Sequence, residues 1–183
     1  MYPRQQAWKR AAGAALVSAA LAAAAGCGGG GGGGSTAASE AQDVRGAGFA
    51  YSAPADWQVT RAARSATARP GDGPSLASVT VLVLRSRYRP EFFSKVAGEL
   101  DRVTDTLAAK LRGKVIARRS ILVAGIKSRQ YDVAYSRAGS SLIDRITYVL
   151  RGKSEYYLLC RWPGDGGEST GCDLLTSSFR IPR

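Results

Sequence analysis

The chain has 183 residues, with 26 Lys and Arg against 14 Asp and Glu, and its formal net charge is +12. It contains no histidine, which excludes a Ser–His–Asp triad. A charge this positive indicates an anionic partner, whose class depends on where the protein works.

The first 26 residues have the pattern of an export signal. The basic residues Arg4, Lys9 and Arg10 precede a fifteen-residue apolar run, Ala11–Ala25. A transmembrane helix needs about 20 predominantly apolar residues, so this run is too short to span a bilayer. We therefore expect residues 1–26 to be a targeting segment and not part of the fold.

A cysteine follows this run in the sequence Ala24-Ala25-Gly26-Cys27. Small residues before a cysteine resemble the lipobox of bacterial lipoprotein signal peptides, although Ala24 stands where leucine is common. The resemblance implies lipidation of Cys27 and a protein anchored to the extracytoplasmic face of the cell membrane. Two acyl chains are enough for stable anchoring. An ordinary secretory signal cleaved at an A-x-A site is the alternative.

Export changes the interpretation of the charge. Without the three basic residues of the signal, 23 basic and 14 acidic side chains remain, a net charge of +9. Outside the cytoplasm we expect no nucleic-acid partner, and the polyanions available are lipid headgroups and cell-envelope polymers. An ordinary solvated basic surface is the alternative.

Residues 27–47 are rich in Gly, Ser and Ala and include an unbroken glycine run, Gly28–Gly34. This composition predicts a flexible tether. Residues 48–183 have the composition of a single globular domain, long enough for one hydrophobic core.

The first half of the domain contains three predicted strands. Short strands are expected at Phe49–Tyr51 and Gln58–Ala62, and a third at Val79–Arg89. Residues 63–75 include a run of Pro and Gly and predict a loop.

The end of the Val79–Arg89 segment is strongly basic. Alternation along a strand places its three arginines on one face and Tyr88 on the other. Arg118 and Arg119 add charge on a later strand. Charges that protect an edge strand from aggregation are the alternative to a binding surface. The candidate residues for an anionic partner are Arg85, Arg87, Arg89, Arg118 and Arg119.

A long helix is predicted after Pro90, which suits a first helical turn. Apolar residues recur at helical spacing from Phe92 to Leu111, and Gly113 is the expected C-terminal cap. Short turns separate the strands that follow, so neighbours are antiparallel. These are Lys114–Leu122, Ile126–Arg137, Leu142–Leu150 and Ser154–Trp162, before a short helix at Cys172–Ser178 against which Phe179 and Ile181 pack.

The predicted fold class is therefore α+β: an antiparallel sheet packed by one long helix and a short C-terminal helix. Cys160 and Cys172 remain after Cys27, and an exported chain favours a disulfide between them. Two reduced, buried cysteines are the alternative. Two thiolates without histidine do not complete a zinc site, and we expect no metal and no cofactor.

Two features bear on catalysis. Gly167-Glu168-Ser169-Thr170-Gly171 matches the G-x-S-x-G pattern, but that motif needs a strand-to-helix turn and a histidine base. The acidic residues are scattered, and we expect them to be solvated, including three on the outer side of the long helix: Glu99, Asp101 and Asp105. No catalytic residue is assigned.

Several short segments carry a family resemblance: Phe49-x-Tyr51-x-x-Pro54-x-x-Trp57, the helix after Arg89-Pro90, Val123-Ala124-Gly125, Tyr156-Tyr157-Leu158 and Ser178-Phe179-Arg180. With the order of elements, they resemble the Mog1/PsbP-like fold, including the actinobacterial lipoproteins of the LpqN type. The resemblance implies an accessory or binding protein without a shared catalytic site, and no functional residue transfers from it.

The expected function is that of an exported, lipid-anchored, non-enzymatic binding or accessory protein of the cell envelope. Its partner would be a protein or an anionic envelope polymer, and its oligomeric state is not predicted. One alternative is a carrier that holds a small hydrophobic ligand between the sheet and the Phe92/Phe93 helix. Another is a hydrolase of the envelope. A buried apolar cavity favours the carrier, clustered carboxylates favour the enzyme, and a convex basic face favours the binder.

Overall fold

The structure, a computed structural model, describes residues 40–166 and 170–182. The predictions for the export signal, for Cys27 and for Ser169 lie outside the described residues. The elements in chain order are β1 (Ala41–Gly46), β2 (Phe49–Pro54), β3 (Gln58–Ala62), β4 (Ser65–Arg69), β5 (Leu76–Val83), η1 (Pro90–Phe92), α1 (Phe93–Lys110), β6 (Lys114–Val123), β7 (Ile126–Arg137), β8 (Ser140–Arg151), β9 (Ser154–Pro163) and α2 (Thr170–Ser178).

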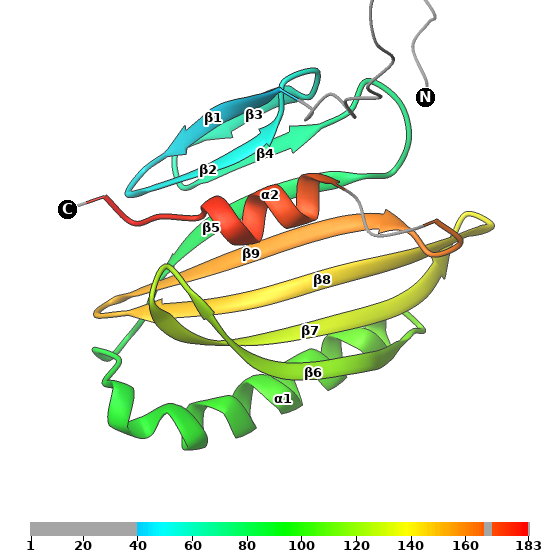
Figure 1. Cartoon of the computed structure of the whole chain (residues 1–183). Coiled ribbons are helices and arrows are strands. Elements are labelled where there is room, and N and C mark those ends of the chain that lie inside the picture. Colours follow the sequence, from blue (N-terminus) through cyan, green and yellow to red (C-terminus); the bar gives the residue numbers. More distant parts are fainter. Residues whose placement is uncertain (1–39, 167–169, 183) are drawn as a thin grey trace, which may run out of the picture. The chain divides into compact units, whose positions relative to one another are not determined.

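The centre of the fold is a seven-stranded antiparallel sheet with the order β3-β4-β5-β9-β8-β7-β6. The last strand, β9, lies between β5 and β8 and so joins the first three strands of the sheet to the β6–β8 meander (Figure 1). The strands β1 and β2 form a separate antiparallel hairpin. The predicted α+β class, with one long and one short helix, is confirmed.

Tight turns set the register of the meander. The two residues between β6 and β7, Ala124 and Gly125, have φ of 51° and 73°, and Ala138 and Gly139 between β7 and β8 have φ of 50° and 82°. Positive φ at both central residues is the type I′ geometry that matches the twist of paired strands. The turn positions predicted from the sequence are confirmed.

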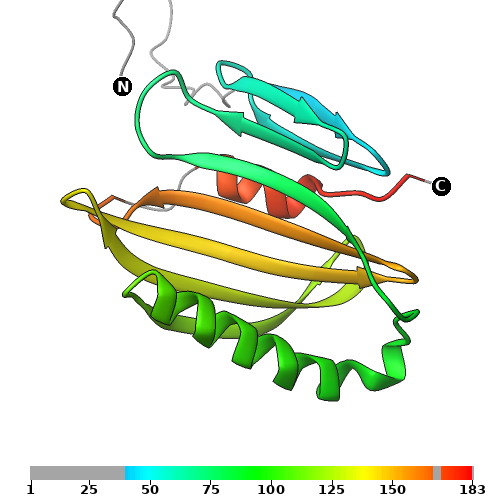
Figure 2. The ribbon, with the colours of Figure 1, turned by 180° about the vertical axis from the view of Figure 1, so that it is seen from behind.

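Each face of the sheet has its own core. On one face, the β1–β2 hairpin and α2 cover a cluster that includes Tyr51, Val79, Leu158 and Phe179. On the other face, α1 contributes Leu100 and other side chains to a cluster on β7 and β8. Figure 2 shows α1 along one side of the sheet, while β9 and β5 continue beyond it. The second face is therefore only partly covered.

The disulfide holds α2 on the first face. Cys160 on β9 and Cys172 on α2 are bonded, with their Cα atoms 5.4 Å apart, and both residues are buried. The predicted pairing is confirmed. In the chain-entropy model a cross-link closing a loop of about 15 residues contributes about 3 kcal/mol. Phe179 and Ile181 also pack against this core, as expected.

Three segments differ from the sequence predictions. β1 lies inside the expected tether 27–47, where only Val44 is buried and no alternating apolar pattern marks a strand. β4 lies inside the expected loop 63–75, and its core side chains are the small Ala66 and Ala68. The expected strand Val79–Arg89 begins earlier and ends at Val83.

The end of α1 differs in detail. Arg112, not Gly113, takes the positive φ, of 54°, after the helix. The N–H of Gly113 donates to the carbonyl of Ala108 at 2.9 Å. A side chain at Gly113 would meet the carbonyl oxygen of Ala134, so glycine is required there by close packing.

Candidate binding surface

The first sequence candidate is the segment 84–89, which we call the arginine loop. β5 ends at Val83 because its partner β9 begins opposite it, at Ser154, so the ladder has no further residues. The loop is held by backbone bonds from Leu84 N to Lys153 O, 2.9 Å, and from Tyr88 N to Gly152 O, 2.7 Å.

These bonds give the arginine loop an inner and an outer side. Leu84 and Tyr88 are half-buried and pack against the α1-side core. Arg85, Arg87 and Arg89 are exposed, and among the described residues no ion pair is formed by any of them. The prediction that Tyr88 lies opposite three exposed arginines therefore holds, although the segment is a loop and not a strand.

The structure does not add Arg118 and Arg119 to this surface. Arg118 bonds to Asp105 of α1, whereas Arg119 bonds to Asp132 at 2.5 Å and to Gln130 at 2.6 Å. Adjacent residues of a strand point to opposite faces, so the two arginines belong to different faces of the sheet. Their charges are paired within the fold, so the structure does not bring them together with the arginine loop, and their role in partner binding stays a prediction.

Two carboxylates predicted to be solvated are buried in ion pairs. Asp132 accepts bonds from Arg145 at 2.8 Å and from Arg119, and Asp144 accepts bonds from Arg161 at 2.7 and 2.9 Å. Asp132 and Arg145 are direct cross-strand neighbours, as are Asp144 and Arg161. Opposite charges in such positions stabilise a sheet. These pairs can be recognised only once the strand register is known.

The prediction that Asp101 lies on the outer side of the helix is wrong, because its side chain faces the sheet. Its carboxylate accepts bonds from Arg129, at 3.0 and 3.2 Å, and from the Tyr131 hydroxyl at 2.6 Å. Burial alone would raise the pKa of Asp101, but these bonds outweigh it and hold the pKa below its usual value. Glu99 pairs with Arg102 on the outer side of α1, as expected.

Three hollows lie along the α1 side of the sheet, and together we call them the trough. The first, of about 610 Å³, is lined by Tyr88, Pro90 and the tips of two hairpins. The second, of about 360 Å³, is lined by the arginine loop and by the start of α1. The third, of about 430 Å³, lies between α1 and β9. Tyr88 lines both the first and the second hollow, and Glu155 lines both the second and the third, so the three hollows are adjacent.

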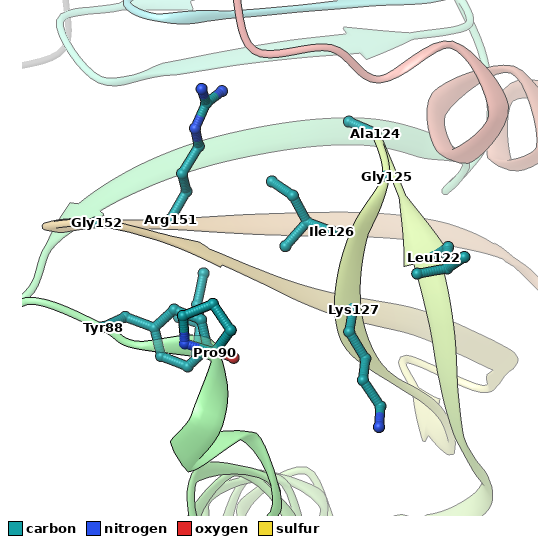
Figure 3. Close-up of a pocket in the computed structure, with 10 residues that line it drawn as sticks. Tyr88, Pro90, Leu122, Ala124, Gly125, Ile126, Lys127, Arg151 and Gly152 are labelled. Carbon is teal, nitrogen blue, oxygen red and sulfur yellow. The ribbon is translucent and has the colours of Figure 1, made fainter.

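The first hollow, which we call the hairpin gap, exists because β7 and β8 separate. Their pairing ends at Arg129 and Tyr148, while the β6–β7 and β8–β9 ladders continue to the hairpin tips. Figure 3 shows Lys127 and Arg151 extending from opposite sides of the gap, with Tyr88 and Pro90 closing its lower end. The Lys127 amine lies 4.7 Å from the centre of the Phe93 ring.

The residue that sequence reasoning missed is Glu155. It lies on β9 between Leu82 of β5 and Leu150 of β8, its direct cross-strand neighbours. The cations that share its hollows are Lys110 and the arginines of the loop, and none of the described residues forms an ion pair or a side-chain hydrogen bond with it. Burial raises the pKa of the Glu155 carboxyl above its ordinary value.

The described residues contain no group of three or more His, Cys, Asp or Glu side chains placed to hold a metal ion. Within residues 40–166 and 170–182, every helix is too short or too polar to cross a bilayer. Asp132 and Asp144 are the two buried carboxylates of the described residues. They occupy adjacent positions of the β7–β8 ladder and therefore lie on opposite faces of the sheet, each bonded to a different arginine.

Comparisons with known proteins support the fold and indicate no function. No protein-family model and no curated protein matches the chain. A crystal structure of a Bacteroides thetaiotaomicron protein is similar with a TM-score of 0.52 and 10% identity, over 74% of this chain and 46% of that one. The chain thus spans about half the length of that protein.

A second solved structure is a Pseudomonas aeruginosa protein of unknown function, described as a putative regulator. Its TM-score is 0.36 at 20% identity, over 66% of this chain and 81% of that one, and it carries no argument here. Neither of these two structures is described as a Mog1/PsbP-like protein or a lipoprotein, so both resemblances stay predictions.

The environment of Glu155 gives a stability prediction. Glu155→Gln should raise the free energy of unfolding at pH 7, because the folded state no longer holds a desolvated charge. The pKa of Glu155 is raised in the folded state, so the penalty is absent below the unfolded pKa of about 4.3. It develops between the unfolded and the native pKa and is complete above the native pKa. Urea unfolding at pH 7 and pH 4 measures both effects.

Glu40→Gln is the matched control for this prediction, because it removes the same charge from an exposed position. A Glu155→Gln variant that is less stable than the wild type at pH 7, or a gain that is the same at pH 4, would contradict the account.

Proposed function

We propose that this protein is a lipid-anchored, non-enzymatic accessory protein of the cell envelope that binds an anionic, phosphate-bearing component of the membrane surface. The observation that carries the proposal is the contrast among its arginines. Arg85, Arg87 and Arg89 are exposed in one loop without an ion pair from the described residues. Six other arginines, on α1 and inside the strands β6–β9, are paired with carboxylates: Arg102, Arg118, Arg119, Arg129, Arg145 and Arg161.

The energetics favour an external anion at this loop. Like charges held within five residues repel one another, and an anionic surface removes that cost. Each Lys or Arg close to an anionic membrane contributes about 1 kcal/mol, and the effect weakens with salt. The lipobox-like sequence before Cys27 and the glycine-rich tether support a location at the membrane. The Mog1/PsbP-like resemblance, with its accessory and binding proteins, supports a role without catalysis.

The anchoring part of the proposal depends on one residue. Cys27→Ala in the full-length chain should abolish lipidation and processing, because the thiol is the acceptor of the lipid. The variant should leave the membrane fraction or migrate as the unprocessed form, as measured by cell fractionation, gel mobility and intact-mass analysis. Unchanged mass shift and unchanged membrane retention would overturn the anchor.

The binding part depends on the arginine loop. Changing Arg85, Arg87 and Arg89 to Glu should abolish the salt-sensitive binding of residues 28–183 to phosphatidylglycerol vesicles, since attraction becomes repulsion. Surface substitutions of this kind usually change stability by less than about 0.5 kcal/mol. Co-sedimentation across a salt series measures the binding, and unfolding curves check the fold.

The control variant changes Arg64, Arg69 and Arg137 to Glu. These three arginines are exposed and form no ion pair with the described residues. It alters the net charge equally, so it should retain most of the binding if the arginine loop is the site. An equal loss of vesicle binding in both variants would overturn the arginine loop as the site and indicate a general basic surface. Binding to isolated envelope polymers but not to vesicles would show that the anionic partner is the polymer and would overturn a partner at the membrane surface.

A further inference from the structure

Exposed apolar side chains gather in the trough. Among the described residues, six large apolar side chains are exposed, and three of them line the second and third hollows. These are Leu82 of β5, Phe92 of η1 and Val103 of α1, exposed by 46%, 52% and 55%. Apolar side chains gathered in a concave surface indicate a site for an apolar ligand.

The shape of this surface follows from the packing of α1. The helix packs over β6 and β7 and touches β8 through Thr104 and Tyr148. The side chains of β9 that point the same way, Tyr157 and Leu159, stay half-buried because no element within residues 40–166 and 170–182 covers them fully. The open strip between α1 and β9 is the third hollow, and the volumes of the hollows lie in the range of about 300–1,000 Å³ that is typical of ligand sites.

The charges along the trough are unequal. Lys127 and Arg151 line the hairpin gap, and the three loop arginines line the adjoining second hollow, so five cations stand toward one end. The third hollow has an almost entirely apolar wall with Lys110 and Glu155 at its margins. Glu155 lies where the second and third hollows meet. An anionic headgroup is therefore favoured at the gap end and disfavoured beside Glu155.

We propose that the trough binds a single-chain anionic amphiphile, with its headgroup between Lys127 and the arginine loop and its hydrocarbon chain along Leu82, Phe92 and Val103. This rests on the proposed function and names the ligand class of the same site. The charge pattern fixes the direction of the ligand: the head lies at the hairpin gap, and the chain passes Glu155 toward the end of α1. The protein thereby removes one amphiphile from a membrane surface, in addition to touching that surface.

The test uses residues 28–183, which contain every contact of the described structure, and myristoyl-lysophosphatidylglycerol below its critical micelle concentration. Calorimetric titration should give saturable binding of one molecule per chain. Myristoyl-lysophosphatidylcholine, with the same chain and a zwitterionic head, should bind more weakly. Glycerol phosphate, the head without the chain, should show no measurable binding.

Two sets of variants separate head from chain. Leu82→Gln with Val103→Gln should weaken binding by about tenfold, since both side chains lose apolar contact with the chain. Ile116→Gln, an exposed apolar residue that lines none of the three hollows, is the matched control and should leave binding unchanged. Changing Arg85, Arg87 and Arg89 to Gln should remove the preference for the anionic head.

The direction of the affinity change in Glu155→Gln is the most discriminating test of the ligand charge. An anionic amphiphile should bind this variant at least as tightly as the wild type, because a repulsive charge beside the chain is gone. Weaker binding would instead indicate a ligand cation held by Glu155 and would overturn the inference.

The outcomes also distinguish this inference from the proposed function. Vesicle binding that depends on the arginine loop, without saturable lysophospholipid binding or without an effect of the Leu82 and Val103 changes, overturns the trough as a ligand site and leaves the function standing. Absence of both kinds of binding overturns both.

Discussion

A seven-stranded sheet has two faces to shield from water, and this chain covers them unequally. One face carries the β1–β2 hairpin and α2, which the Cys160–Cys172 disulfide holds in place. Of the described α-helices only α1 lies on the other face, and one helix cannot cover seven strands. The uncovered strip beside β9 is the origin of the trough, and the early end of β5 at Val83 places the arginine loop at its margin.

The same topology explains where charge is neutralised and where it is not. On the meander strands, β-sheet register sets Asp132 opposite Arg145 and Asp144 opposite Arg161, so these arginines are satisfied inside the fold. Breaking such a buried pair is costly because it leaves an uncompensated charge. Beyond the end of β5 there is no facing strand among the described residues, and the arginines of the loop form no ion pair there, although Glu155 lines the same hollow. The absence of ion pairs from the arginine loop, among the described residues, is thus a consequence of strand length.

The sequence predicted what depends on local pattern. The period of α1, the two-residue turns such as Ala124-Gly125 and the cysteine pair are all local or compositional signals, and the structure confirms them. It did not predict β1, where Val44 alone is buried, or the ion pairs of Asp101, Asp132 and Asp144, which depend on non-local register. Glu155 was missed for the same reason: only pairing with β5 and β8 sets it between Leu82 and Leu150.

The central claim is that the partly covered face, and not the face under α2, is the binding surface. Hydrogen–deuterium exchange of residues 28–183, with and without myristoyl-lysophosphatidylglycerol below its critical micelle concentration, tests it most directly. The account predicts slower exchange in the arginine loop, along α1 and at the start of β9, with β1, β2 and α2 unchanged. Slower exchange confined to β1, β2 and α2, or no change anywhere, would contradict it.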